Sequence, residues 1–119
     1  MTKIVMHLPF PPSVNAVWRS NRGRVHKSSA YISWQAVAGQ EWMTQKIKQP
    51  RFLPGDFSLI LVLVNPDRRR RDLDNYSKAA LDFCKLHRVI QDDSLARKIY
   101  LRWGTKKEAP LGARLILRG

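Results

Sequence analysis

Residues 57–75 read FSLILVLVNPDRRRRDLDN, and this stretch decides how the rest of the chain can be arranged. Its first half, from Phe57 to Val64, is apolar except for Ser58, which is typical of a central strand covered on both faces. Asn65 and Pro66 end the strand, and four consecutive arginines follow. The pattern after the arginines predicts a helix over about 75–87, whose apolar side consists of Tyr76, Ala79, Ala80, Phe83 and Cys84.

The N-terminal part of the chain adds a strand and a helix. Ile4, Met6 and Leu8 alternate with other residues, so we expect a short strand over residues 3–8, ended by the prolines that follow. Residues 13–28 are predicted to form a long loop. Ser28 or Ser29 is expected to cap a helix over about 30–48, whose apolar face consists of Tyr31, Trp34, Ala38 and Trp42.

Two further alternating patterns, at about 98–103 and 113–118, predict strands in the last third of the chain. Residues 104–112 are expected to carry the turn between these two strands. The complete order is then β-α-β-α-β-β. We therefore predict one α+β domain over residues 1–119, with a small mixed sheet and two helices.

The chain is strongly basic, since 22 Lys and Arg against nine Asp and Glu give its 119 residues a net charge of +13. Such a charge favours nucleic acid or an anionic membrane surface as partner. Membrane is the weaker alternative, because no apolar run approaches the roughly 20 residues of a spanning helix. The early prolines interrupt the first apolar stretch, so we expect no secretory signal there, and the single cysteine, Cys84, cannot form an internal disulfide. We therefore expect a cytoplasmic protein with Cys84 in its core.

The few acidic residues are unevenly placed along the chain. Six of the nine fall between residues 67 and 93, beside the arginine block: Asp67, Asp72, Asp74, Asp82, Asp92 and Asp93. A protein that only coats a polyanion gains nothing from carboxylates at this place, because each one repels phosphate. Carboxylates are useful there if a divalent cation lies between them and the phosphate. The pattern favours metal-dependent phosphodiester chemistry on nucleic acid.

The spacing of these acids suggests how they could work together. Asp72 and Asp74 can converge only if the chain is extended there, because residues i and i+2 diverge on a helix. Asp74 is a plausible N-cap of the following helix, and Lys78 would lie one turn along the same face. The chain could then return after the helix and add a carboxylate of the Asp92–Asp93 pair. Three carboxylates and a nearby lysine would form an oxygen cage for Mg²⁺.

Simpler explanations exist for several of these residues. Asp74 could only cap a helix, Asp92 and Asp93 could only form a turn, and Asp67 is expected in a turn. Asp82 is predicted to form an i,i+4 ion pair with Lys78. The arginine block favours a phosphate clamp over a solvated surface. The three histidines are too far apart for a zinc site, and Trp18 is the one aromatic residue whose position suits base stacking.

The run Asp67–Asn75, followed by Lys78-Ala79-Ala80 and by Asp92-Asp93, closely resembles the RusA-like Holliday junction resolvases. Residues 8–15 and 21–24 are similar to the N-terminal part of that family. The resemblance implies a homodimeric, Mg²⁺-dependent endodeoxyribonuclease, often encoded by phages and prophages and acting on four-way DNA junctions in recombination and repair. Mn²⁺ could replace Mg²⁺.

The resemblance also implies roles for individual residues. Asp72, Asp74 and Asp93 would ligate the metal, and Lys78 takes the position of the catalytic lysine. The residues expected to contact DNA are Arg68, Arg69, Arg70, Arg71, Arg19, Arg22, Arg24, Lys27 and Asn15. This chain departs from the family where Arg88 stands in place of a glycine and Gln91 in place of an apolar residue.

Three functions remain open at this point: a junction-resolving endonuclease, a nuclease for a broader range of branched DNA, and a nucleic-acid-binding protein without catalysis. A four-way junction has nearly two-fold symmetry, which suits a symmetric dimer with one site in each subunit. The apolar strand at 57–64 and the helix face with Trp34 and Trp42 are expected to supply surface for a second subunit.

Overall fold

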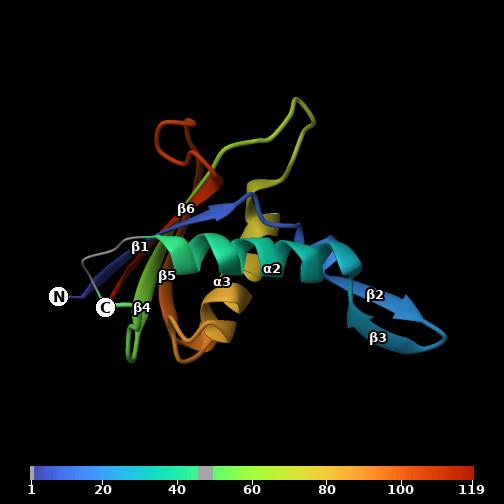
Figure 1. The fold of residues 1–119 in the computed structure, drawn as a ribbon, viewed down its shortest axis with the longest axis horizontal. Helices are drawn as coiled ribbons and strands as arrows, with labels where there is room; N and C mark the ends of the chain where they lie inside the picture. The colour runs from blue at the N-terminus through green and yellow to red at the C-terminus, as the bar shows by residue number, and fades with distance from the viewer. Residues whose placement is uncertain (1, 46–49) are drawn as a thin grey trace.

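A four-stranded mixed sheet forms the centre of the protein in a computed structural model, which describes residues 2–45 and 50–119. Its strands are β1 (Lys3–Pro9), β4 (Phe57–Leu63), β5 (Ala96–Trp103) and β6 (Gly112–Arg118). Their order in the sheet is β1-β6-β4-β5 (Figure 1). β4 pairs in parallel with β5, and all other pairs are antiparallel. The predicted α+β class with a mixed sheet is confirmed.

Two helices supply the second layer of the fold, as the sequence predicts. They are α2 (Ser29–Thr44) and α3 (Ser77–Leu86), and a short α1 (Val14–Val17) was not predicted. Ser28 caps α2, because its side chain accepts a hydrogen bond of 3.1 Å from the backbone N–H of Tyr31. The end of the range predicted for this helix falls on residues 46–48, outside the described residues. No helix within residues 2–45 and 50–119 has the length and apolar content needed to cross a membrane.

The core lies between the helices and one face of the sheet. The register aligns Met6, Leu115 and Leu61 across three strands, and all three side chains are fully buried. The same core cluster contains side chains of both α2 and α3, so both helices lie on this face. Ser58 and Ile60 point to the other face and keep partial exposure. The expectation that β4 is covered on both faces is therefore wrong at these positions.

The segment after Trp103 connects β5 to β6 as expected, but the two strands are not paired with each other, because β4 lies between them. The segment from β4 through α3 to β5 is a parallel crossover, which places β5 beside β4, and β6 then pairs with the opposite edge of β4. Two hydrogen bonds hold this connection at the end of β4: Gly104 N–H to the Leu63 carbonyl at 2.8 Å, and Val64 N–H to the Gly112 carbonyl at 2.9 Å.

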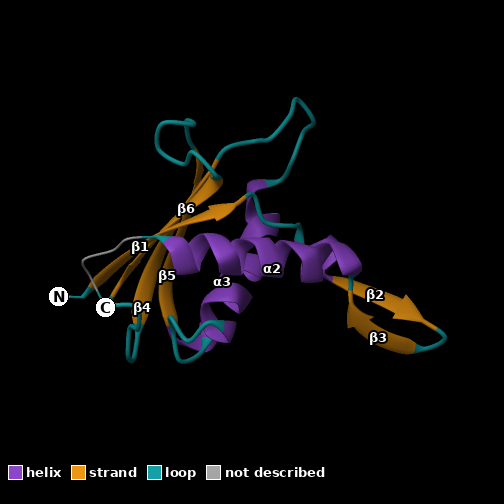
Figure 2. Cartoon of the chain, viewed as in Figure 1, coloured by secondary structure: helices purple, strands orange, loops and turns teal. Residues whose placement is uncertain are grey.

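The segment predicted as a loop over 13–28 contains a β-ribbon instead. β2 (Trp18–Asn21) pairs with β3 (Arg24–Lys27), and the two strands project away from the sheet (Figure 2). Arg22 and Gly23 form the turn with φ angles of 51° and 77°, a left-handed conformation typical of tight hairpins. Every residue of both strands is exposed, so neither strand has a buried face that could produce an alternating pattern.

The second helix begins later than expected. A 3₁₀ helix, η1 (Leu73–Tyr76), precedes α3, and Asp74 lies in its first turn instead of capping a helix. Side chains at i and i+3 align in a 3₁₀ helix, so this tighter turn directs both Leu73 and Tyr76 to the core. Packing of these two residues explains why the predicted extended conformation stops at Asp72.

The surfaces expected to meet a second subunit are used in part within the chain. Phe57 and Trp42 are 2% and 3% exposed, and Trp34 packs partly buried against the same core. These side chains therefore belong to the core of the monomer, whereas Ser58 and Ile60 on the other face of β4 stay partly exposed. An interface with a second subunit on that face remains a prediction.

Candidate functional site

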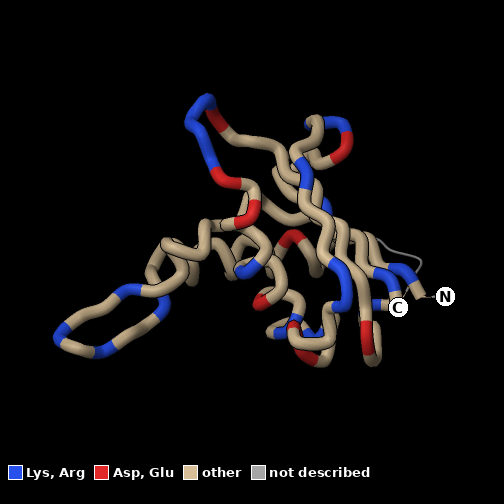
Figure 3. Tube along the Cα trace, turned by 180° about the vertical axis from the view of Figure 1, so that it is seen from behind, with Lys and Arg blue, Asp and Glu red and all other residues tan. Residues whose placement is uncertain are grey.

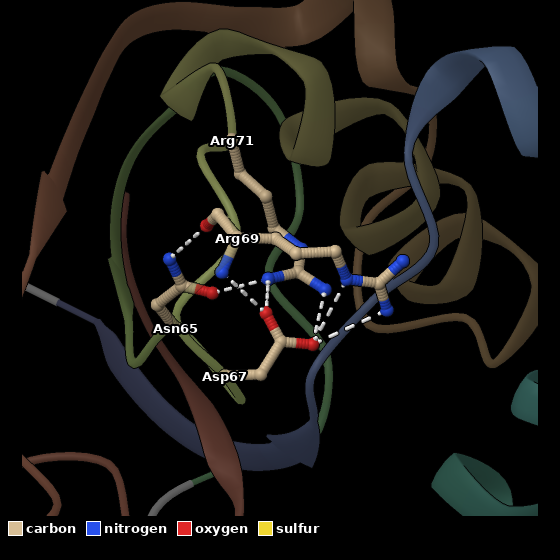
Figure 4. Close-up of polar contacts among 4 residues, drawn as sticks. All are labelled: Asn65, Asp67, Arg69 and Arg71. Atoms are coloured by element: carbon tan, nitrogen blue, oxygen red, sulfur yellow. Dashed lines mark hydrogen bonds and ion pairs between the residues drawn. The ribbon is translucent and has the colours of Figure 1, made fainter.

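The connection from β4 to η1 is organised around the carboxylate of Asp67 (Figure 4). Arg71 donates two hydrogen bonds to it, at 2.6 and 3.0 Å. Arg69 donates to the same carboxylate from its backbone N–H at 2.8 Å and from its guanidinium at 3.2 Å. Asn65 accepts from Arg71 at 2.5 Å and donates to the Arg69 carbonyl at 2.9 Å. A single acid thus fixes two of the four arginines.

These contacts divide the arginine block into two kinds of residue. The side chain of Arg71 is only 16% exposed and its guanidinium lies 5.7 Å from the centre of the Phe10 ring, whereas Arg69 is 80% exposed. Hydrogen bonds from Arg71 and Arg69 hold the pKa of Asp67 well below its ordinary range. Arg68 and Arg70 are exposed and have no ion pair among the described residues. Those two are free to meet a phosphate, while Arg71 shapes the loop.

Lys78 brings two of the predicted acids together on α3. Its Nζ lies 3.0 Å from Asp82 and 3.2 Å from Asp93, so the expected Lys78–Asp82 ion pair is confirmed. The hydroxyl of the buried Tyr31 donates to Asp82 at 3.5 Å, and burial with the nearby Asp82 charge raises the pKa of Tyr31 to about 12. Hydrogen bonding to Asp82, and then to Asp93, raises the pKa of Lys78. Lys78 is therefore a positioned cation at neutral pH, which suits charge stabilisation.

The two acids at the end of the chain's crossover have different contacts. Asp92 accepts hydrogen bonds from Lys85 at 2.7 Å and from the backbone of Ser94 at 3.0 Å, so it holds the turn. Asp93 is the member of the pair that reaches Lys78.

Asp72 and Asp74 are exposed, and neither forms a hydrogen bond or ion pair through its side chain within the described residues. In that part of the chain, no three acidic, histidine or cysteine side chains lie close enough together to hold one metal ion. The expected cage of three carboxylates is thus not formed by protein alone. The donors still fit Mg²⁺, which is usually bound through one or two carboxylates, with waters and substrate phosphates completing its shell.

Comparison with known proteins decides the family. The family model described as endodeoxyribonuclease RusA matches residues 9–112. The chain belongs to the RusA family. This match includes residues 64–72, the arginine loop that connects β4 to η1, together with η1, α3 and the Asp92–Asp93 turn. These segments carry the residues described above.

Several relatives carry the name crossover junction endodeoxyribonuclease RusA. The one from Shigella sonnei (strain Ss046) is 42% identical over 78 residues, which are 63% of this chain and 61% of that protein. The one from Enterobacteria phage 82 is 40% identical over the same length. The one from Escherichia coli O139:H28 is 38% identical over 91 residues, 74% of this chain and 72% of that protein. The first of these matches therefore spans a little under two thirds of the relative's length.

The structure explains how this chain departs from the RusA pattern after α3. Arg88 has a φ of 55°, so it adopts the left-handed conformation that a glycine would take at a helix end. Val89 N–H then bonds to the Cys84 carbonyl at 2.8 Å, which closes the last turn. Gln91 accepts from the Gly55 N–H at 3.0 Å, a contact that an apolar residue could not form. Both departures are accommodated, and Asp93 still reaches Lys78.

The other residues predicted to contact DNA lie far from the arginine loop in sequence. Arg19, Arg22, Arg24 and Lys27 are all exposed on the β2–β3 ribbon, which carries no acidic residue (Figure 3). Asn15 is exposed on α1, and its carbonyl accepts a hydrogen bond of 3.2 Å from Arg19. Sequence reasoning missed the roles of Tyr31 and Asn65. The only signal for the Asp67–Arg71 pair was the spacing of four residues, which is informative on a helix and not in a loop.

Proposed function

We propose that residues 1–119 form one RusA-like endonuclease domain that resolves four-way DNA junctions by paired, symmetric, Mg²⁺-dependent nicks. The observation that carries this proposal is the position of Lys78, a charged ammonium fixed beside Asp93 within a chain of the RusA family. A protein that only binds DNA has no need to hold a lysine against two acids.

In the proposed reaction, water attacks a phosphodiester in line and the bond to the leaving strand breaks. Asp72, Asp74 and Asp93 are the proposed ligands of Mg²⁺, which Mn²⁺ could replace. Because three acidic side chains do not converge on one point among the described residues, waters and a substrate phosphate would complete the shell of the ion, and the ion would supply a Lewis acid. Lys78 donates hydrogen bonds to a phosphate oxygen and offsets the charge that develops there. Asp82 keeps Lys78 in place from the other side. Asp82 is itself held by the hydrogen bond that it accepts from the Tyr31 hydroxyl.

Binding of the junction rests on the basic surface. Arg68 and Arg70 are the exposed arginines of the loop that form no ion pair among the described residues, and we expect each to neutralise one phosphate. Replacing either arginine by Ala should reduce the steepness of the salt dependence: the negative slope of the logarithm of the binding constant against log salt should shrink in magnitude by about 0.9. Arg71→Ala should instead unfold the loop, because this residue is held by Asp67 and Asn65.

Cleavage of a labelled four-way junction, measured beside plain duplex and a three-way branch, tests the proposal. We expect Mg²⁺-dependent nicks at symmetric positions in the four-way junction alone. Asp72→Asn and Asp74→Asn should abolish cleavage and leave junction binding equal or tighter, because removing a carboxylate lessens repulsion of phosphate. Equal cleavage of all branched substrates would favour the broader nuclease. Absence of cleavage with intact binding would favour the non-catalytic DNA-binding protein.

A further inference from the structure

A groove of about 480 Å³ runs between the base of the β2–β3 ribbon and α3. Trp18 and Lys27 line it from the ribbon, and Lys78, Lys85 and Leu86 line it from the helix. This volume is within the range of about 300–1,000 Å³ that is usual for sites of small ligands. The groove therefore connects the ribbon with the lysine of the proposed active site.

The base of the ribbon is fixed against α3. Val17, the residue before Trp18, is fully buried in a small cluster with Tyr31 and Ala79. The Val17 carbonyl also accepts a hydrogen bond of 2.8 Å from Ser28 N–H, which closes the hairpin at its base. Trp18 is thus held at one wall of the groove although its side chain is 46% exposed.

The walls of the groove combine apolar and cationic groups. Trp18 and Leu86 are both exposed apolar side chains, and within residues 2–45 and 50–119 no aromatic ring packs on the indole. Lys27 and Arg88 add positive charge and form no ion pair among the described residues. Asp82 is the acid that lines the groove, and its charge is paired with Lys78. The Lys27 ammonium also lies 5.6 Å from the centre of the Tyr31 ring, which leaves its charge unpaired by any acid of the described residues. An exposed aromatic face beside cations without ion pairs matches the chemistry of a nucleotide, whose base stacks and whose phosphate is anionic.

We propose that this groove binds one unstacked nucleotide of a single DNA strand, with its base on Trp18 and its phosphates against Lys27 and Arg88. In a duplex, both faces of each base are covered by its neighbours, so the indole can reach a base face only where a strand is unpaired. The inference deepens the proposed function and rests on it, because a nucleotide in this groove places its neighbouring phosphate near Lys78.

Binding in EDTA, measured by fluorescence anisotropy, tests this inference without catalysis. The probes are a short labelled oligothymidine and a blunt duplex of the same length. Trp18→Ala should weaken binding of the oligothymidine about tenfold, with unchanged duplex binding, because stacking on one base is lost. Lys27→Ala and Arg88→Ala should each lower the salt slope for the oligothymidine by about 0.7. Tyr100→Ala is the matched control, since Tyr100 is an aromatic residue 60% exposed on β5 and outside the groove.

A second readout does not depend on the alanine variant. Oligothymidine should quench the tryptophan fluorescence of the protein, and Trp18→Phe should remove that quenching while it keeps most of the affinity. Oligothymidine binding that is unchanged in Trp18→Ala, or quenching that persists in Trp18→Phe, would overturn the inference. Junction cleavage tests the proposed function separately, so a failure of either conclusion leaves the other measurable.

Discussion

Lys78 shows how a single residue can be fixed by its neighbours before any substrate binds. Its ammonium lies between two carboxylates that come from different parts of the chain, Asp82 on the same helix and Asp93 after the turn. The side chain of Lys78 therefore loses its conformational entropy when the protein folds and not when substrate binds. Pre-organised charge of this kind is most effective where negative charge develops during the reaction.

Lys78→Ala should therefore reduce turnover of a four-way junction about 100-fold or more at saturating Mg²⁺, with a much smaller effect on binding. Single-turnover cleavage and anisotropy measured in parallel separate the two effects. Lys98→Ala is the matched control, because Lys98 is an exposed lysine on β5 without an ion pair in the described residues. If turnover in Lys78→Ala equals that of wild type, Lys78 has no role in the reaction and only forms ion pairs at the surface.

Asp67 predicts a dependence of stability on pH. Its pKa in the folded protein is lowered from 3.8, so its contribution to stability is present above pH 3.8 and is lost as the pH falls through the lowered value. Asp67→Asn should therefore lower the Tm at neutral pH, and the difference from wild type should narrow as the pH falls below 3.8. Arg68→Ala, an exposed neighbour, should follow wild type at every pH. A constant difference for Asp67→Asn would point to packing instead of charge.

At the scale of elements, sequence patterns predicted which residues face the core and not which elements are neighbours. Alternation identified β1, and helical spacing identified α2, because burial on one face leaves a periodic record. The periodic spacing of apolar residues gives no information on which strands pair, so it did not predict that β4 lies between β5 and β6. The β2–β3 ribbon left no pattern, since it buries nothing. The candidate site was predictable where its contacts follow helical spacing, as for Lys78 and Asp82, and unpredictable where a loop or a distant tyrosine completes it.

Gly112, at the start of β6, packs closely against Phe10, whose ring lies beside the guanidinium of Arg71. It has a φ of 121°, and a Cβ atom at this position would lie 2.7 Å from the backbone nitrogen of Phe10. Gly112→Ala should thus lower the free energy of unfolding by more than the about 1–3 kcal/mol of backbone strain, because Phe10 must also move. Urea unfolding measures this loss. Gly23→Ala is the control, because Gly23 also has a positive φ, 77°, but no atom lies within 4 Å of an added Cβ. A loss of unfolding free energy in Gly23→Ala as large as that in Gly112→Ala would refute the role of Phe10.

For the whole molecule, we expect a homodimer at micromolar concentration. The described part of the 13.8 kDa chain contains one candidate site for cleavage, and a four-way junction requires two nicks related by a two-fold axis. Light scattering should give twice the mass of the chain, and the nicks should be paired across the junction. A monomer that makes single, unpaired nicks would leave the general nuclease as the better explanation.

The exposed β2–β3 ribbon also determines where the backbone can be cut without loss of the fold. The ribbon contains four exposed trypsin sites, at Arg19, Arg24 and Lys27 in its strands and at Arg22 in its turn, so brief digestion should cleave there before it reaches the sheet. The piece that ends at Arg22 contains β1, which pairs with β6 along its whole length and buries Ile4, Met6 and Leu8. After a single cut in the ribbon, the two fragments that separate on a denaturing gel should therefore elute together as one native particle. Co-elution would show that backbone continuity through the ribbon is dispensable for the fold, because non-covalent contacts alone would then hold β1 in the sheet.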